Sequence, residues 1–185
     1  MASTEREGMG LLRVDKRQAR RGFARAAGRY DEVAVLQQEI GRRMIERLGF
    51  MKIAPLRILD LGCGTGYSID ALLKLYPKAE LIALDIAEPM LRRARRRGRW
   101  LKRPRCLCAD LDAVPLADGS IDLVFANAAL QWSADPPKAF ADLGRVLRPG
   151  GLLIFTSFGP DTLRELRSAW ADVDGAEHVH GFIDM

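Results

Sequence analysis

The sequence contains few of the residues that build metal and disulfide sites. Its 185 residues include only three cysteines and two histidines. Cys63, Cys106 and Cys108 are odd in number and lack zinc-ligand spacing, so they predict neither a disulfide framework nor a metal centre. Reduced thiols are typical of a cytoplasmic protein. Both histidines, His178 and His180, lie in the C-terminal tail, so the chain offers no obvious catalytic histidine.

Long apolar runs are also missing. The longest fall far below the roughly 20 residues that a membrane-spanning helix needs. The first residues contain no apolar signal core, so we expect a chain that is not secreted. Hydrophobic residues make up 48% and charged residues 29% of the sequence. This balance predicts one globular domain with a substantial buried core.

The basic residues are unevenly distributed. The net charge is +5, and nine of the fourteen residues 92–105 are arginine or lysine with no acidic residue among them. A second basic group occupies residues 16–29. Such groups attract acidic partners, whether nucleic acid, an anionic membrane or an acidic protein. A solvated, arginine-rich helix face is the alternative interpretation.

From residue 57 onwards, short apolar runs alternate with helical patterns. Residues 15–48 read as helix with a break near Gly28, and Pro55 ends that region. We expect strands at 57–61, 80–85, 106–110, 121–127 and 152–157, with helices at 68–75, 89–97 and 137–147 between them. This order predicts a parallel α/β sheet with helices on both faces. Ligands of such sheets bind at the carboxyl ends of the strands.

The strongest chemical signal is a glycine loop that follows the first expected strand. Glycines at 62, 64 and 66 let the backbone turn tightly and bring its N–H groups to a ligand. A nicotinamide-cofactor loop would need glycine at 67 or 69, where Tyr67 and Ile69 stand. Asp60, just before the loop, suits a ligand that carries an ammonium and a sulfonium. A purely structural glycine turn is the alternative.

Polar residues end the next strands. Asp85 ends the second, where its carboxylate can accept hydrogen bonds from both ribose hydroxyls of a nucleoside. Ile86 and Met90 could pack on an adenine ring, although Met90 also fits a plain core position. Asp110 ends the third strand and could accept from the adenine amino group, with Leu111 beside it. Asn127 ends the fourth strand, beneath the expected position of a reactive methyl group.

These motifs resemble the class I S-adenosylmethionine-dependent methyltransferases. The resemblance lies in residues 59–66 (LDLGCGTG), Asp85, residues 110–111, residues 122–124 (DLV) and residues 147–151 (LRPGG). It implies a Rossmann-like fold and S-adenosylmethionine as cofactor, without a metal. The cofactor residues that it implies are Asp60, Gly62, Cys63, Gly64, Gly66, Asp85, Ile86, Met90, Asp110, Leu111 and Asn127.

The flanking segments resemble one family more closely, the malonyl-[acyl-carrier-protein] O-methyltransferases of biotin synthesis. Residues 23–31 (FARAAGRYD) and 34–37 (AVLQ) are similar to its N-terminal segment, residues 127–132 (NAALQW) to its substrate-side loop, and residues 157–167 with Trp170 to the segment after its fifth strand. The resemblance implies a helical lid at 1–50 and a cofactor-binding core at 51–185. The superfamily sheet has seven strands, so we expect its last two, and this family's C-terminal third, to be missing here.

The resemblance also implies a reaction. The carboxylate of a malonyl thioester on acyl carrier protein would take the methyl group, which gives the methyl ester used in biotin synthesis. A carboxylic acid with a pKa of about 4 is already ionised near neutral pH, so no general base is expected. The candidates for positioning the substrate are Arg25, Arg29, Tyr30, Asn127, Gln131, Trp132, Arg164 and Arg167. The acidic carrier protein would dock on basic residues 16–29 or 92–105.

Three alternatives remain open. The basic groups would suit a nucleic-acid methyltransferase, but the (Asp/Asn)-Pro-Pro-(Tyr/Phe) motif of enzymes that methylate base nitrogens is replaced by Asn127-Ala-Ala-Leu. The cofactor motifs fit a methyltransferase for another small molecule equally well. A non-catalytic assembly factor that keeps the cofactor fold is the third alternative.

Overall fold

The strands form one parallel sheet, as the alternating pattern predicted. The computed structural model describes residues 14–98, 102–159 and 161–173. The strands are β1 (Arg57–Leu61), β2 (Glu80–Asp85), β3 (Arg105–Cys108), β4 (Ile121–Asn127) and β5 (Leu147–Thr156). Their order in the sheet is β3-β2-β1-β4-β5, and every neighbouring pair is parallel. The strand order therefore reverses between β1 and β4, where sheets of this kind bind ligands.

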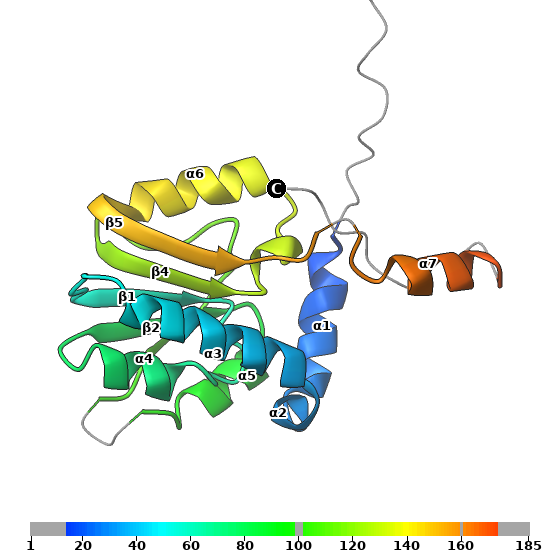
Figure 1. Cartoon of the computed structure of the whole chain (residues 1–185), viewed down its shortest axis with the longest axis horizontal. Helices are drawn as coiled ribbons and strands as arrows, with labels where there is room; N and C mark the ends of the chain where they lie inside the picture. The colour runs from blue at the N-terminus through cyan, green and yellow to red at the C-terminus, as the bar shows by residue number, and fades with distance from the viewer. Residues whose placement is uncertain (1–13, 99–101, 160, 174–185) are drawn as a thin grey trace, which may run out of the picture.

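The helices lie on both faces of the sheet and at one end of it (Figure 1). They are α1 (Lys16–Ala26), α2 (Tyr30–Val33), α3 (Val35–Gly49), α4 (Ile69–Leu75), α5 (Glu88–Ala94), α6 (Pro136–Val146) and α7 (Arg164–Ala171), with a 3-10 turn η1 (Leu130–Trp132). None of these described helices combines the length and apolarity needed to cross a membrane. In Figure 1 the arrowheads of β4 and β5 point toward α1, while α7 stands apart from the sheet.

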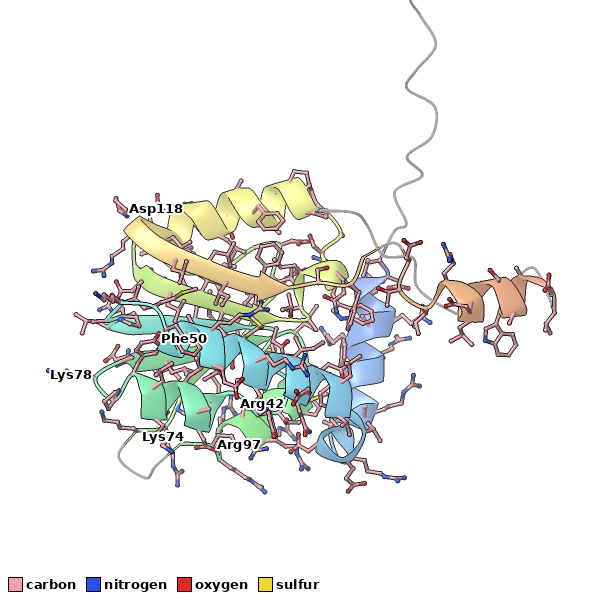
Figure 2. The ribbon with its side chains drawn as sticks, viewed as in Figure 1. Arg42, Phe50, Lys74, Lys78, Arg97 and Asp118 are labelled. Carbon is pink, nitrogen blue, oxygen red and sulfur yellow. The ribbon has the colours of Figure 1, made fainter. Side chains whose placement is uncertain are left out.

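Two apolar cores flank the sheet because alternate residues of each strand face opposite sides. Ile58 faces a core that includes Met44 of α3 and Leu72 of α4. Leu59 faces a second core that includes Leu143 of α6 and Val124. Charged side chains such as Lys74, Lys78 and Asp118 project outward around the body (Figure 2). The α3 helix thus packs on the sheet and belongs to the folded core.

Several predicted boundaries were wrong by a few residues. The third strand ends at Cys108, so Asp110 lies in the loop beyond it. The helix expected at 89–97 ends at Ala94, and the one expected at 137–147 spans Pro136–Val146. Two prolines fit in its first turn, where their missing N–H groups would have no partner.

The fifth strand begins earlier than predicted, directly after α6. Leu147 pairs with Ile121 and Leu152 with Leu123, so the residues between Leu147 and Leu152 bulge opposite Asp122. Gly150 has a φ of 78° in this bulge. The segment that was expected only to end the helix therefore also forms the start of β5.

Candidate active site

A pocket opens at the carboxyl ends of β1, β2 and β4, under α1 and α2. It encloses about 1030 Å³, open solvent at its mouth included. Twelve residues predicted from the sequence line it: Tyr30, Asp60, Gly62, Cys63, Gly64, Asp85, Ile86, Met90, Asp110, Leu111, Asn127 and Trp132. The structure thus brings together side chains from residue 30 to residue 132.

The glycine loop has the backbone conformation that its sequence predicted. Gly62 and Gly64 have φ angles of 68° and 54°, in the left-handed region. A β-carbon on Gly62 would lie 2.6 Å from the β-carbon of Ala129, so the loop after β4 rests directly on this glycine. Gly66 also has a positive φ, but it does not line the pocket. Its missing side chain makes room for Ile69 and Ala94.

Asp85, at the end of β2, is hydrogen-bonded to the backbone of the glycine loop. Its two carboxylate oxygens accept hydrogen bonds from the backbone N–H groups of Gly64 (2.9 Å) and Ala87 (2.8 Å). Burial raises the pKa of this carboxyl, although the backbone donors oppose that shift. Each oxygen keeps a second lone pair, so Asp85 can still accept from ligand hydroxyls.

Asp60 is the most deeply buried carboxyl group of the site. Its side chain is 3% exposed, and Oδ2 has no hydrogen-bond partner. Burial, together with the charge of Asp85, raises its pKa to about 7. A buried carboxylate oxygen without a partner is costly in an empty pocket and favourable beside a bound cation. The site therefore suits a ligand with a positively charged group beside Asp60.

The N-terminal helices provide one wall of the pocket. Tyr30 packs with Ala27, Ala87, Met90 and Phe23 in a small apolar cluster. Burial and the charges of Asp85 and Asp31 raise the pKa of its hydroxyl. The ring of Phe23 also lies edge-on to Trp132, with centroids 5.1 Å apart. These contacts place aromatic rings from α1, α2 and η1 around the same cavity.

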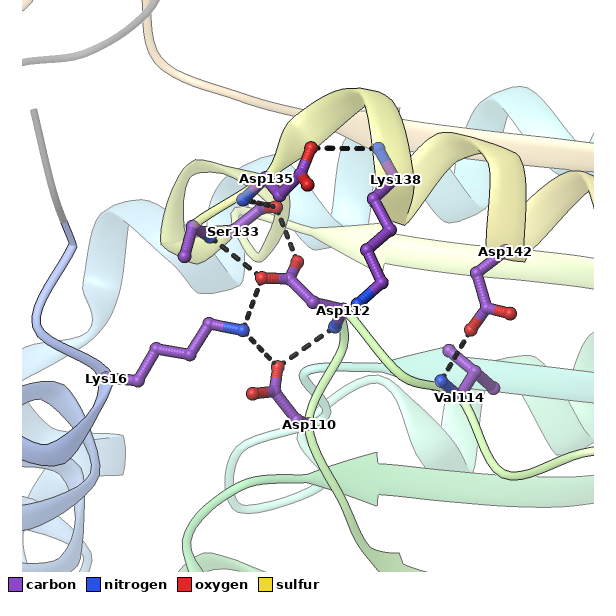
Figure 3. A network of polar contacts seen from close by, with 9 residues as sticks. Lys16, Asp110, Asp112, Val114, Ser133, Asp135, Lys138 and Asp142 are labelled. Atoms are coloured by element: carbon purple, nitrogen blue, oxygen red, sulfur yellow. Dashed lines mark hydrogen bonds and ion pairs between the residues drawn. The ribbon is translucent and has the colours of Figure 1, made fainter. Parts of the chain in front are cut away.

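Lys16 was assigned to a surface group, and the structure corrects this. Its Nζ lies 2.5 Å from Asp110 Oδ1 and also contacts Asp112 Oδ2 (Figure 3). Burial alone would lower the pKa of Lys16, but the two carboxylates outweigh that effect and raise it. Asp112 in turn accepts hydrogen bonds from Ser133 Oγ and the Ala134 N–H. This network fixes α1 to the loops that follow β3 and η1.

A second ion-pair group fixes α2. The side chain of Asp31 accepts a hydrogen bond from Thr65 Oγ1 and from Arg97, whose Nη2 lies 2.8 Å away. Arg93 lies 3.7 Å from the same carboxylate and donates to the Gly28 carbonyl. No sequence pattern predicted these contacts, because the partners lie 34 to 66 residues apart.

Five positioning candidates lie outside the pocket lining or outside the described part of the chain. Arg29 is 84% exposed and pairs with Glu32, and Arg25 faces solvent. Arg164 is 67% exposed and pairs with Asp161. The side chain of Arg167 is outside the described residues. Gln131 donates from Nε2 to the Ala128 carbonyl (2.7 Å) and does not line the pocket.

Fourteen further lining residues were not predicted as site residues. They are Lys16, Ala19, Phe23, Asp31, Ala34, Gln37, Gln38, Thr65, Tyr67, Ser68, Leu84, Ala109, Ala128 and Ala129. Spacing could have revealed three of them, because residues 16, 19 and 23 share one face of α1. Within the described ranges, no group of three or more metal-binding side chains is assembled.

Comparison with known proteins agrees with this geometry. Residues 59–155 match the family model described as "Methyltransferase domain". The chain belongs to this methyltransferase family. A crystal structure of an S-adenosylmethionine-dependent methyltransferase from Mesorhizobium loti is 32% identical, with a TM-score of 0.52, and the match covers 62% of this chain and 52% of that one.

The curated relatives carry a more specific name. A malonyl-[acyl-carrier protein] O-methyltransferase from Halorhodospira halophila is 54% identical over 171 residues, which cover 92% of this chain and 58% of the relative. The protein of the same name from Laribacter hongkongensis is 48% identical, and the match covers 93% of this chain and 61% of the relative. The chain thus spans about three fifths of the length of these relatives.

Proposed function

We propose that the pocket binds S-adenosylmethionine and that its methyl group is transferred to the free carboxylate of a malonyl thioester on acyl carrier protein. The observation that supports this most directly is the unpartnered carboxylate oxygen of Asp60 beside the left-handed glycine loop. The name shared by the relatives supports the malonyl acceptor. In biotin synthesis the product would be the methyl ester of the malonyl group.

The residues of the pocket divide into binding and shielding roles. Asp60 would hold the ammonium group of the cofactor, Asp85 its ribose hydroxyls, and Ile86 with Met90 its adenine ring. When bound, the cofactor supplies a methyl group on a positively charged sulfur. The acceptor carboxylate, already ionised near neutral pH, would take this methyl group and release S-adenosylhomocysteine, so the residues of the site would not need to move a proton. The rings of Phe23, Tyr30 and Trp132 would exclude water and leave the carboxylate poorly solvated.

Among the described residues that line the pocket, no unpaired lysine or arginine is available to bind the acceptor carboxylate. Lys16 is the only lysine or arginine among the lining residues, and Asp110 and Asp112 neutralise it. Positioning by neutral groups therefore fits the pocket better than positioning by an arginine. Tyr30, Asn127 and Trp132 are the predicted candidates that remain at the cavity wall.

The structure also favours one of the two basic groups as the carrier-protein surface. Around α5, Arg92 and Arg95 pair with Glu88, and Arg93 and Arg97 pair with Asp31. On the solvent side of α1, four arginines are exposed and form no side-chain ion pair within the described residues: Arg17, Arg20, Arg21 and Arg25. Since the opposite side of α1 lines the pocket, an acidic carrier protein bound there would hold its thioester close to the cavity.

A methyl-transfer assay tests the reaction. Malonyl-carrier protein, malonyl-CoA and free malonate are compared as acceptors, with this chain and a full-length relative run side by side. We expect transfer to the malonyl thioesters and none to an acetyl thioester, which lacks the carboxylate. Absence of transfer to any malonyl thioester by the full-length relative would refute the acceptor and leave cofactor binding to be measured separately.

A charge-reversal set tests the docking surface. Arg17→Glu/Arg20→Glu/Arg21→Glu should raise KM for malonyl-carrier protein about tenfold or more and reduce its salt dependence, because surface charges steer association. KM for malonyl-CoA should stay the same. The matched control is Arg92→Glu/Arg96→Glu/Arg103→Glu, with the same change in net charge. Equal effects of both sets would show that net charge, and not α1, attracts the carrier protein.

A further inference from the structure

One residue after β4 has a backbone conformation that its side chain disfavours. Ala128 has a φ of 49°, in the left-handed region that residues with a β-carbon rarely adopt. It lines the pocket, and the next residue, Ala129, lies against Gly62 of the glycine loop. A left-handed alanine persists only where its surroundings hold it.

Two side chains hold the Ala128 backbone, one on each side. The Ala128 N–H donates to Thr156 Oγ1 at 3.0 Å. The Ala128 carbonyl accepts from Gln131 Nε2 at 2.7 Å. Thr156 is the last residue of β5 and does not itself line the pocket. Its hydroxyl reaches the site only through its hydrogen bonds.

The same hydroxyl orients the side chain of Asn127. Asn127 Nδ2 donates to the Gln37 carbonyl at 2.7 Å, and a carbonyl can only accept, so the orientation of the amide is fixed. Asn127 Oδ1 therefore faces Thr156 and accepts the hydroxyl proton at 3.0 Å. The hydroxyl keeps a lone pair for the Ala128 N–H. The direction of each hydrogen bond in this series is therefore fixed: Ala128 N–H donates to Thr156, Thr156 donates to Asn127, and Asn127 donates to the Gln37 carbonyl.

We propose that Thr156 is a positioning residue for methyl transfer: its hydroxyl fixes Asn127 and the left-handed Ala128 at the wall of the cofactor pocket. Through Asn127 the same series of hydrogen bonds reaches α3, at the Gln37 carbonyl. Asn127 also packs closely on Gly41 of α3, since a β-carbon on this glycine would lie 2.8 Å from Asn127 Nδ2. Three elements (the end of β4, the end of β5 and α3) are therefore joined by one donor–acceptor sequence. The kinetic part of this inference rests on the proposed methyl transfer, whereas the backbone part does not.

The test compares three variants. Thr156→Val keeps the branched shape of the side chain and removes both of its hydrogen bonds, whereas Thr156→Ser keeps the hydroxyl. Ser120→Ala is the control: it removes a hydroxyl that donates to the Ala117 carbonyl, in a turn outside the pocket lining. The first readout is hydrogen exchange of the Ala128 amide in the folded protein. We expect about tenfold faster exchange in Thr156→Val, the equivalent of one lost hydrogen bond, and wild-type exchange in the other two variants.

The second readout is kinetic. In Thr156→Val we expect kcat to fall about tenfold or more, because small displacements of a site wall cost rate. The Kd for S-adenosylhomocysteine, measured by calorimetry, should change less than threefold. Thr156→Ser should restore kcat. Unchanged Ala128 exchange in Thr156→Val, or an equal loss of kcat in Thr156→Ser, would overturn the assignment.

Two further outcomes are informative. Should Thr156→Val not fold, Thr156→Ala removes the same hydroxyl with a smaller side chain, and the same exchange measurement decides whether that hydroxyl holds the Ala128 amide. If even a full-length relative transfers no methyl group to a malonyl thioester, the proposed acceptor fails, while faster Ala128 exchange in Thr156→Val would still support the role of the hydroxyl.

Discussion

At the scale of single residues, the burial of Asp60 predicts that stability depends on pH. Its pKa is about 7 in the folded protein because burial and the charge of Asp85 oppose ionisation, against about 3.9 in an unfolded chain. A raised folded pKa means that this carboxyl lowers stability as the pH rises from about 4 to about 7 and changes it no further above that. At 1.36 kcal/mol for each pKa unit, the loss is at most about 4 kcal/mol.

Asp60→Asn should remove this dependence. We expect the difference in unfolding free energy between Asp60→Asn and the wild type to grow in favour of the variant from pH 4.5 to 7.5. Denaturant titrations at several pH values measure it. Cofactor binding should respond in the opposite way: wild-type affinity increases through pH 7 as Asp60 ionises, and the variant binds more weakly without that increase. A difference in unfolding free energy that is independent of pH would contradict a buried, ionisable Asp60.

Two helical glycines provide a matched pair for the packing around Asn127. Gly41→Ala places a β-carbon 2.8 Å from Asn127 Nδ2 and 3.3 Å from Ser68 Oγ, so we expect a loss of about 1–3 kcal/mol of stability together with weaker cofactor binding. Gly22→Ala meets no atom within 4 Å and should stabilise α1 by about 0.5–1 kcal/mol. Unfolding free energies check both. A Gly41→Ala variant as stable as Gly22→Ala would disprove the close contact.

At the scale of elements, α1 and α2 are held over the pocket by charged contacts as well as by a small apolar cluster. Lys16 joins α1 to the loop after β3, and Asp31 joins α2 to Thr65 and Arg97. Because these contacts are only partly buried, salt screens them, and each contributes about 1 kcal/mol. The cover over the pocket should therefore be easier to open than the apolar cores.

Asp31→Asn tests the contact of α2. We expect about fivefold weaker binding of S-adenosylhomocysteine, since the helix would cover the pocket for a smaller fraction of the time. Binding should also lose part of its sensitivity to salt. Glu32→Gln removes a neighbouring charge whose ion-pair partner among the described residues is the exposed Arg29, and it should bind like the wild type. The affinities of both variants for S-adenosylhomocysteine are measured by calorimetry at 50 and 500 mM salt. Equal affinities of Asp31→Asn and Glu32→Gln would show that the Asp31 contacts do not hold α2 over the pocket.

Sequence patterns predicted the elements better than their contacts. Strands β1, β2 and β4 begin and end where the apolar runs do, because a buried parallel strand needs an uninterrupted apolar segment. The end of β3 was predicted two residues too late, since Asp110 turns away to meet Lys16, 94 residues distant. Gly66 was predicted to face the cofactor because spacing cannot distinguish a ligand contact from the packing of Ile69. Gln131 was predicted to touch substrate, although its amide holds Ala128.

At the scale of the whole molecule, the site lies at one end of the sheet, whereas the apolar cores that stabilise the fold lie on its two faces. The apolar cores lie between the sheet and its helices, while Asp60, Asp85 and Asn127 all stand at the carboxyl ends of their strands. The pocket can therefore include a buried unpartnered carboxylate without interrupting either core. A ligand that satisfies this carboxylate should stabilise the entire fold.

The size of that stabilisation distinguishes the cofactor. At a concentration 100 times its Kd, a ligand that binds only the folded state adds about 2.7 kcal/mol, which for a chain of this length raises Tm by about 5–10 °C. We expect this rise with S-adenosylhomocysteine in a thermal melt. NAD is the control and should give no rise, because Tyr67 and Ile69 stand where its loop needs glycine. Asp60→Asn should reduce the rise with S-adenosylhomocysteine. A rise with NAD as large as that with S-adenosylhomocysteine would mean that the pocket recognises only the shared adenosine.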